Sequence, residues 1–203
     1  MNLLLKTSFL IISCLGVAFA QQSASVAGTV QTEGELPENA RVGVHVVNLE
    51  GVWGDEIATA TPDAGSFSVD ITEEVAPDAL APFDGSVVPL PGLQSEYNVS
   101  PSGVNFTRAQ TDVYIDNNGN DTFDRETDTP YLGVINLEEP SGFFVVLYVD
   151  QDATLSAQGQ SLELAQGWNL FTVRFSPEGE ASYEVTPAVE DAVLDVFSPE
   201  PAN

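Results

Sequence analysis

Cysteine, histidine and lysine are almost absent from this chain of 203 residues. It has one cysteine (Cys14), one histidine (His45) and one lysine (Lys6). A single cysteine excludes an internal disulfide bond, so stability has to come from a hydrophobic core or a bound metal ion. A single histidine excludes zinc and copper sites that are built from several imidazoles.

Positive charge is equally scarce. Beyond residue 20 the basic side chains are four arginines, against 31 aspartates and glutamates in the chain, and the formal net charge is −26. The four are Arg41, Arg108, Arg125 and Arg174. Such a polyanion repels nucleic acid and anionic lipid, and it attracts metal cations or basic partners. We therefore expect no nucleic acid partner.

The motifs of common catalytic sites are also missing. The sequence contains no Gly-x-Ser-x-Gly elbow and no glycine-rich phosphate loop. His45 falls on one face of an expected strand, so we expect a surface residue or a hydrogen-bonded sheet residue rather than a catalytic base. Sequence alone cannot select a pair of catalytic carboxylates among so many acids. We expect the chain not to be an enzyme.

The long apolar run of the sequence lies at its start. Lys6 is followed by an apolar run over residues 9–19 and by Ala18-Phe19-Ala20, which predicts a secretory signal peptide over residues 1–20. The run is too short to cross a bilayer, and no other run approaches that length, so we expect no transmembrane helix. In the alternative, Ile11-Ile12-Ser13-Cys14 resembles a lipobox and Cys14 carries a lipid anchor. Either reading predicts an extracytoplasmic protein, which is secreted, periplasmic or at the cell surface.

The rest of the chain shows a repeating period of two, which is typical of β-strands. Val42, Val44 and Val46 alternate with other residue types, and turn signals separate such stretches. The continuous apolar run from Phe143 to Val149 predicts a central strand that is covered on both faces. We therefore predict an all-β protein with one antiparallel β-sandwich over residues 21–186.

Two segments depart from this period. Residues 76–103 contain five prolines, and we interpret them as a long crossing loop within one domain rather than a linker between two domains. In residues 187–203, Pro187 precedes Val189, Val193 and Val196 at roughly helical spacing. This predicts a short C-terminal helix that covers the sandwich, followed by an acidic tail.

The densest chemical motif runs from Asp116 to Asp128. Oxygen-bearing side chains recur there at alternating positions, a spacing that suits Ca²⁺. The candidate ligands are Asp116, Asn118, Asn120, Thr122 through its carbonyl, Asp124, Glu126 and Asp128. The stretch resembles the Asp-x-Asn-x-Asn calcium loops of EF-hand-like and dockerin-like sequences, and more closely the loops of exported bacterial β-proteins.

Two positions depart from that calcium-loop pattern. Position 6 is Asp121 rather than glycine, and position 12 is Thr127 rather than a bidentate glutamate. Glu126 or Asp128 therefore has to close the calcium shell. The alternative is a solvated hairpin loop without metal, because Asn-Gly is a turn dipeptide and both aspartate and asparagine favour turns.

Two further resemblances concern the fold. Ala27-Gly28-Thr29-Val30 together with Asp63-Ala64-Gly65-Ser66-Phe67 resembles the transthyretin-like, carboxypeptidase-regulatory-like sandwich. Leu147-Tyr148-Val149-Asp150 together with Gly167-Trp168-Asn169-Leu170 is similar to uncharacterised exported proteins of bacterial envelopes. These resemblances imply an immunoglobulin-like or transthyretin-like sandwich in the periplasm or on the cell surface, and they imply no catalytic residue.

Three functional hypotheses follow. The first is an exported, acidic, non-enzymatic β-sandwich with a structural calcium loop, which acts as an accessory to another protein of the cell envelope or surface layer. The second is a binding module for carbohydrate or another small ligand, in which aromatic residues near loops form the platform. Its candidate residues are Trp53, Tyr97, Tyr131 and Trp168. The third is a secreted hydrolase that uses unidentified carboxylates.

Overall fold

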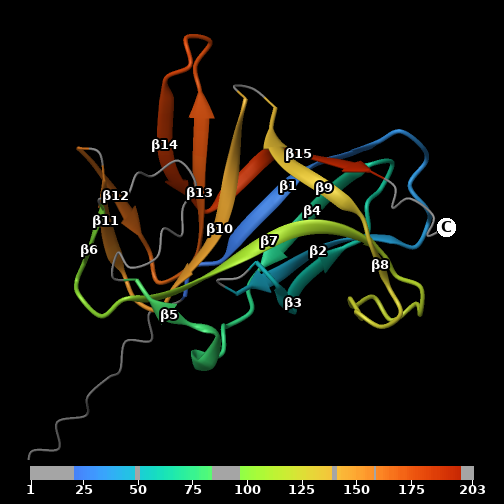
Figure 1. The fold of residues 1–203 in the computed structure, drawn as a ribbon, viewed down its shortest axis with the longest axis horizontal. Coiled ribbons are helices and arrows are strands. Elements are labelled where there is room, and N and C mark those ends of the chain that lie inside the picture. Colours follow the sequence, from blue (N-terminus) through green and yellow to red (C-terminus); the bar gives the residue numbers. More distant parts are fainter. Residues whose placement is uncertain (1–20, 49–50, 84–96, 139–140, 158, 198–203) are drawn as a thin grey trace, which may run out of the picture.

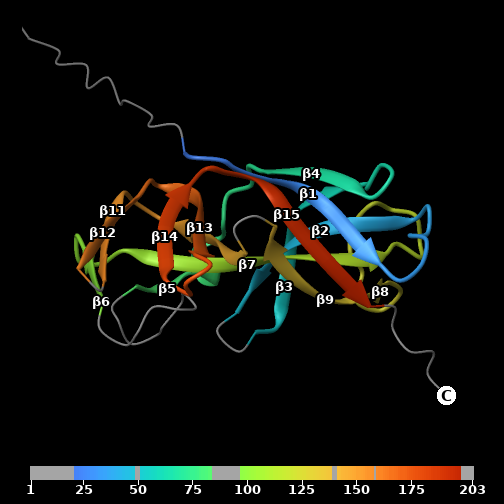
Figure 2. The same cartoon turned by 90° about the horizontal axis from the view of Figure 1, so that it is seen from above.

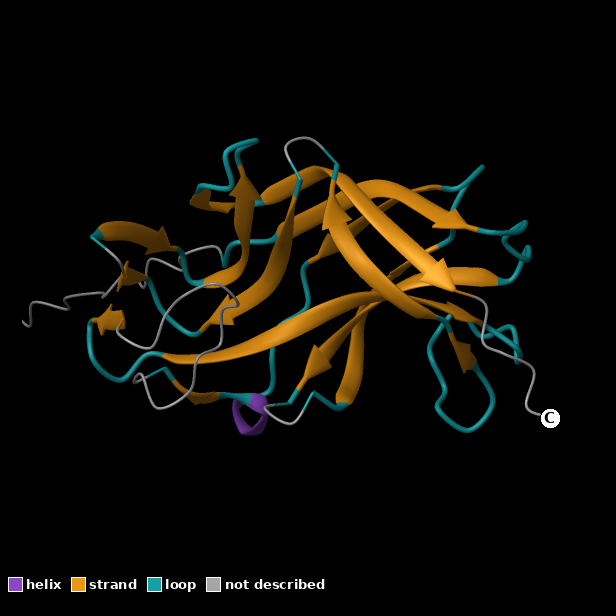
Figure 3. Cartoon of the chain, turned by 45° about the horizontal axis from the view of Figure 1, so that its top comes forward, coloured by secondary structure: helices purple, strands orange, loops and turns teal. Residues whose placement is uncertain are grey.

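The computed structural model describes residues 21–48, 51–83, 97–138, 141–157 and 159–197, and it is built almost entirely of β-strands (Figure 1). Across these residues the chain forms fifteen strands and one short 3₁₀ helix, η1 (Pro77–Ala79). The prediction of an all-β fold is confirmed (Figure 3). In the part of the chain described, no helix has the length and apolar character needed to cross a membrane.

Twelve strands belong to one hydrogen-bonded sheet, which folds into two facing layers. Strands β9 and β10 are joined by the single pair Gly142 and Leu137, and the sheet turns from one layer into the other there. The first layer contains β9 (Leu132–Leu137), β15 (Ala188–Phe197), β1 (Ala24–Thr32) and β4 (Ser66–Ile71). The middle layer contains β3 (Trp53–Ala60), β2 (Ala40–Val47), β7 (Asn105–Ile115), β10 (Gly142–Val149), β13 (Gly167–Phe175) and β14 (Ala181–Thr186).

A separate sheet of three strands forms a third layer at one end of the molecule (Figure 2). It contains β12 (Gln160–Leu164), β11 (Ala153–Ala157) and β6 (Tyr97–Ser100). Two further strands of two residues each, β5 (Ala81–Pro82) and β8 (Thr129–Pro130), pair with β7. The outer face of the middle layer is the face that points away from the first layer.

Two hydrophobic cores lie on opposite faces of the middle layer. Phe144, Val146 and Tyr148 of β10 belong to the core between the first and middle layers. Leu147 and Val149 of the same strand belong to the second core, which the three-stranded sheet covers. Because alternate side chains of a strand point to opposite faces, this continuous apolar run is covered on both sides. The prediction of a central strand over residues 143–149 is confirmed.

The predicted C-terminal helix is wrong, because residues 188–197 form strand β15. This strand pairs antiparallel with β9 and parallel with β1, so the sandwich is also not purely antiparallel. The register between β1 and β15 shifts between Val26 and Gly28, and the core side of β15 takes Val189 and then Ala192, Leu194 and Val196. The shift leaves Val189 and Val196 on the same side of an extended strand, as two turns of a helix would also do.

The proline-rich segment takes several local structures. It contains η1, β5 and β6, while residues 84–96 of the predicted crossing loop lie outside the described residues. Strands that precede the segment pair with strands that follow it, since β1 pairs with β15 and β2 pairs with β7. The residues on either side of the segment therefore share the same sheet.

Candidate calcium loop and the histidine beneath it

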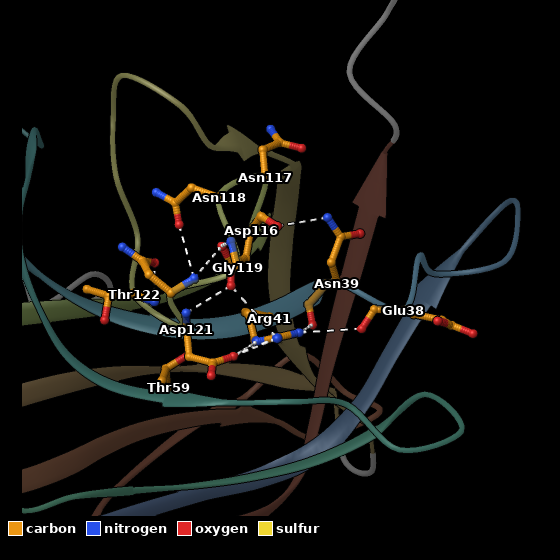
Figure 4. Close-up of polar contacts among 12 residues, drawn as sticks. Glu38, Asn39, Arg41, Thr59, Asp116, Asn117, Asn118, Gly119, Asp121 and Thr122 are labelled. Carbon is orange, nitrogen blue, oxygen red and sulfur yellow. Dashed lines mark hydrogen bonds and ion pairs between the residues drawn. The ribbon is translucent and has the colours of Figure 1, made fainter.

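The loop over residues 116–128 connects β7 to β8 and lies against the outer face of β2, β3 and β7 (Figure 4). Of the seven predicted calcium ligands, Asp116 and Asp128 are buried and Asp124 is half-buried. The other four are exposed: Asn118, Asn120, Thr122 and Glu126. The structure therefore turns the first and last carboxylates of the loop inward.

Asp116 organises the first half of the loop. Its Oδ1 accepts hydrogen bonds from the amides of Gly119 at 2.7 Å and Asn120 at 3.3 Å, and its Oδ2 accepts one from the amide of Asp121 at 2.9 Å. Burial alone would raise the pKa of Asp116. The three amides and the guanidinium of Arg41 outweigh burial, and the pKa lies below its ordinary value. Asp116 is therefore held as a carboxylate.

Asp128 closes the loop from its other end. Its Oδ1 accepts a hydrogen bond from the amide of Asn117 at 2.9 Å and one from the hydroxyl of Thr127 at 3.2 Å. Its Oδ2 accepts a hydrogen bond from the amide of Asp124 at 2.7 Å. The carboxylate thus ties the first residues of the loop to the last ones.

Three more of the predicted ligands make short local turns. The side-chain oxygens of Asn118, Asn120 and Asp124 each accept a hydrogen bond from the amide two residues further along, at 2.9 to 3.1 Å. Such turns are what these residue types form in loops with or without a metal ion. The turns are therefore common to the calcium interpretation and to the metal-free hairpin.

The missing glycine at position 6 is replaced by an aspartate in the same backbone conformation. Asp121 has φ of 60°, in the left-handed region that aspartate tolerates better than most residues. Its Oδ1 accepts hydrogen bonds from Arg41 Nε at 2.9 Å and Nη2 at 2.6 Å. Sequence reasoning did not associate Arg41 with the loop, because Arg41 belongs to β2. The sharp turn of the pattern is preserved despite the substitution.

The donor chemistry of the loop suits calcium, but its carboxylates do not form a preassembled cluster. Among the described residues, no three His, Cys, Asp or Glu side chains come together closely enough to hold a metal ion. A carboxylate has about four lone-pair sites, so Asp116 can keep its amide hydrogen bonds and still contact a cation. Calcium would take Asp116, Asn118 and Asn120 as its first ligands, with Asp124 and the Thr122 carbonyl beyond them.

His45 lies beneath the loop and is fully buried. Its ring stacks on Trp53 with the centroids 4.5 Å apart, and it meets the edge of Phe123 of the loop at 5.1 Å. Neither ring nitrogen has a hydrogen-bond partner within the part of the chain that the structure describes. The expectation of a surface or hydrogen-bonded histidine is therefore wrong, because the loop covers this face of the sheet. Burial lowers the pKa of His45 to about 4, which keeps the imidazole neutral at ordinary pH.

Three other titratable side chains share this face of the sheet with His45. Burial raises the pKa of Glu56, and the charge of Asp128 adds to the increase; hydrogen bonds from the Phe123 amide at 2.9 Å and the Tyr114 hydroxyl at 3.4 Å oppose it. Burial also raises the pKa of Asp112 to about 6 and the pKa of Tyr114. Sequence reasoning missed all three. The signal that was available is the alternation that places Asp112 and Tyr114 on one face of β7.

The proposed aromatic platform is mostly inside the protein. Trp168, Tyr97 and Tyr131 are buried, and Trp168 has no exposed surface. Trp53 is half-buried and is stacked on His45. Loops near these residues in the sequence do not bring their rings to the surface, so Trp168, Tyr97 and Tyr131 act as core residues rather than as the alternative ligand platform.

Comparison with known proteins found no matching family, no matching curated protein and no matching solved structure. The resemblances to the transthyretin-like sandwich and to calcium loops therefore remain predictions. Function has to be inferred from the loop and from the residues beneath it.

Proposed function

We propose that this chain is an exported, acidic, non-enzymatic all-β protein whose 116–128 loop binds calcium for stability. We further propose that it works as an accessory to another protein of the cell envelope or surface layer. The observation that supports the calcium site most strongly is the buried Asp116 carboxylate, around which the loop wraps three amides. In calcium loops such a winding brings the oxygens at positions 1, 3 and 5 to the ion.

Electrostatic repulsion within the loop also favours a bound cation. Five acidic residues lie between residues 116 and 128, and the single basic residue there is Arg125. Arg125 donates to the backbone carbonyl of Trp53, while Arg41 reaches the loop from β2 and pairs with Asp121. The two arginines do not balance five carboxylates. A dissociation constant on the order of 10⁻⁴ to 10⁻³ M is expected for an extracellular calcium module of this kind.

Calcium is expected to raise the melting temperature of the native protein, because it binds the folded loop and not the unfolded chain. The double variant Asp116→Ala with Asp124→Ala should lose this calcium-dependent increase. The quantity to compare is the difference between melts in calcium and in EDTA, because Asp116 also holds three amides without metal. Asp70→Ala, which removes an exposed carboxylate from β4, is the matched control and should keep the full increase. A native melting curve that EDTA leaves unchanged would contradict the calcium site.

The accessory role predicts a partner that an acidic surface can recognise. With a net charge of −26, the protein should retain a basic envelope protein at low salt and release it as salt screens the attraction. The measurement is a pull-down from envelope extracts in calcium and in EDTA, with the double loop variant beside the wild type. Recovery of no specific partner in calcium would count against the accessory role while leaving the calcium site intact.

A further inference from the structure

The fully buried His45 and the half-buried Glu56 each place a buried polar atom close to the same point. A Cβ atom added to Gly43 would lie 2.5 Å from Glu56 Oε1 and 2.6 Å from His45 Nε2, so both atoms close on the region above this glycine. Among the described residues, neither atom has a hydrogen-bond partner. Because buried polar atoms are normally paired, two of them that converge on one point favour a bound partner there.

The surroundings of this pair favour a cation as the partner. A neutral imidazole nitrogen and a carboxylate oxygen both offer lone pairs, and a positive ion satisfies both at once. The charged side chain that acts on Glu56 is Asp128, which is negative. The other oxygen of Glu56 is held by the Phe123 amide and the Tyr114 hydroxyl. These two groups orient the carboxylate in the way that outer groups orient metal ligands.

The pair is also connected to solvent through Glu56. This residue is half-buried and lines a cleft of about 570 Å³ between β3 and the segment around residues 73–79. Gly54, Asp55 and Glu73 line the same cleft. Of the pair, Glu56 lines this cleft, and the acidic side chains on its walls attract cations to the neighbourhood of the site.

We propose that His45 Nε2 and Glu56 Oε1 bind a divalent transition-metal ion of the zinc or copper type, at a site separate from the calcium loop. The choice of metal follows from the ligands, because imidazole with carboxylate suits zinc and copper, whereas calcium prefers a shell made of oxygen alone. Two protein ligands leave the remaining coordination positions to water. The site is therefore an exchangeable one rather than a closed structural centre.

The test uses the full folded protein, freed of metal with a chelator and then titrated with Cu²⁺ or Zn²⁺ alone. Since the chain has a single imidazole, bound Cu²⁺ should show electron paramagnetic resonance splitting from one histidine nitrogen. His45→Gln should remove this splitting, and Glu56→Gln should weaken binding at least about tenfold. Asp70→Asn, which removes an exposed charge from β4, should leave copper binding unchanged, and so should saturating Ca²⁺.

Each outcome of these titrations either supports or overturns the metal site. Zinc added in one equivalent should shift the NMR signals of the single imidazole, and this readout does not depend on copper. Copper that binds through oxygen alone, or equally well to wild type and His45→Gln, would show adventitious binding to surface carboxylates and would overturn the proposal. A zinc titration that leaves the imidazole signals unchanged would also overturn the proposal. If His45→Gln does not fold, Glu56→Gln provides the same comparison.

Discussion

Replacement of Gly28 by alanine is expected to disrupt the fold more than any other exchange of a glycine for alanine in the described part of the chain. An added Cβ would lie 1.8 Å from the carbonyl oxygen of Ala192, where β1 runs parallel to β15. Because the obstacle is backbone, the two strands have to separate, and separation opens the core that both strands line. We expect a loss of at least about 3 kcal/mol, which is a large part of an ordinary stability of roughly 5–15 kcal/mol.

The measurement is chemical denaturation followed by tryptophan fluorescence. Gly34→Ala is the matched control, since no atom lies within 4 Å of the position of its Cβ. The control should be neutral or stabilising by about 0.4–1 kcal/mol, because alanine reduces the conformational entropy of the unfolded chain. Equal midpoints for the two variants would contradict the close approach of β1 and β15 at this position.

Trp168→Ala is expected to cost about 3–5 kcal/mol, the usual range for removal of a buried tryptophan. Trp168 is the largest fully buried side chain, and it packs edge-on against Tyr148 with ring centroids 5.2 Å apart. Its indole nitrogen donates to the backbone carbonyl of Glu73 at 2.8 Å. Truncation therefore leaves a cavity in the core between the first and middle layers, and it leaves the Glu73 carbonyl without the indole donor.

Trp53→Ala is the control for the loss of Trp168. Trp53 is half-buried at the edge of the sheet, so its removal should lower the denaturation midpoint less than Trp168→Ala does. A Trp168→Ala variant that unfolds at the midpoint of the wild type would contradict the buried position of this ring. If the prediction holds, loss of ligand binding in a Trp168 variant would report unfolding and would say nothing about a ligand platform.

The strands that sequence predicts best are those whose own residues carry a complete pattern. In β2, the alternation of Val42 and Val44 with other residues is typical of a strand with one buried face. In β10, the continuous apolar run from Phe143 to Val149 is typical of a strand that is covered on both faces. Local composition also predicts the loop at residues 116–128, since aspartate, asparagine and glycine favour turns. These features depend on neighbours within a few positions, which a sequence displays directly.

Strand β15 was not predicted, because its conformation depends on pairing with strands that are distant in sequence. Val189, Val193 and Val196 have a spacing close to helical, and Pro187 fits a helix start equally well. The residues become a strand because β1 and β9 offer hydrogen bonds on both sides. Both partners precede β15 by many residues, so no local window contains the interaction that decides its structure.

In the candidate sites, too, some features follow from the sequence alone and others depend on the tertiary structure. By itself the sequence determined the charge, the all-β class and the run of oxygen-bearing residues from Asp116 to Asp128, because composition and local period are sufficient for these. Tertiary structure alone decided that Arg41 and Glu56 reach this loop, and that Phe123 and Trp53 enclose His45. These contacts join the neighbouring strands β2 and β3 to a loop that lies far from both in the sequence. The packing of the loop and of Trp53 on the sheet removes water from His45, whose nitrogens have no partner among the described residues.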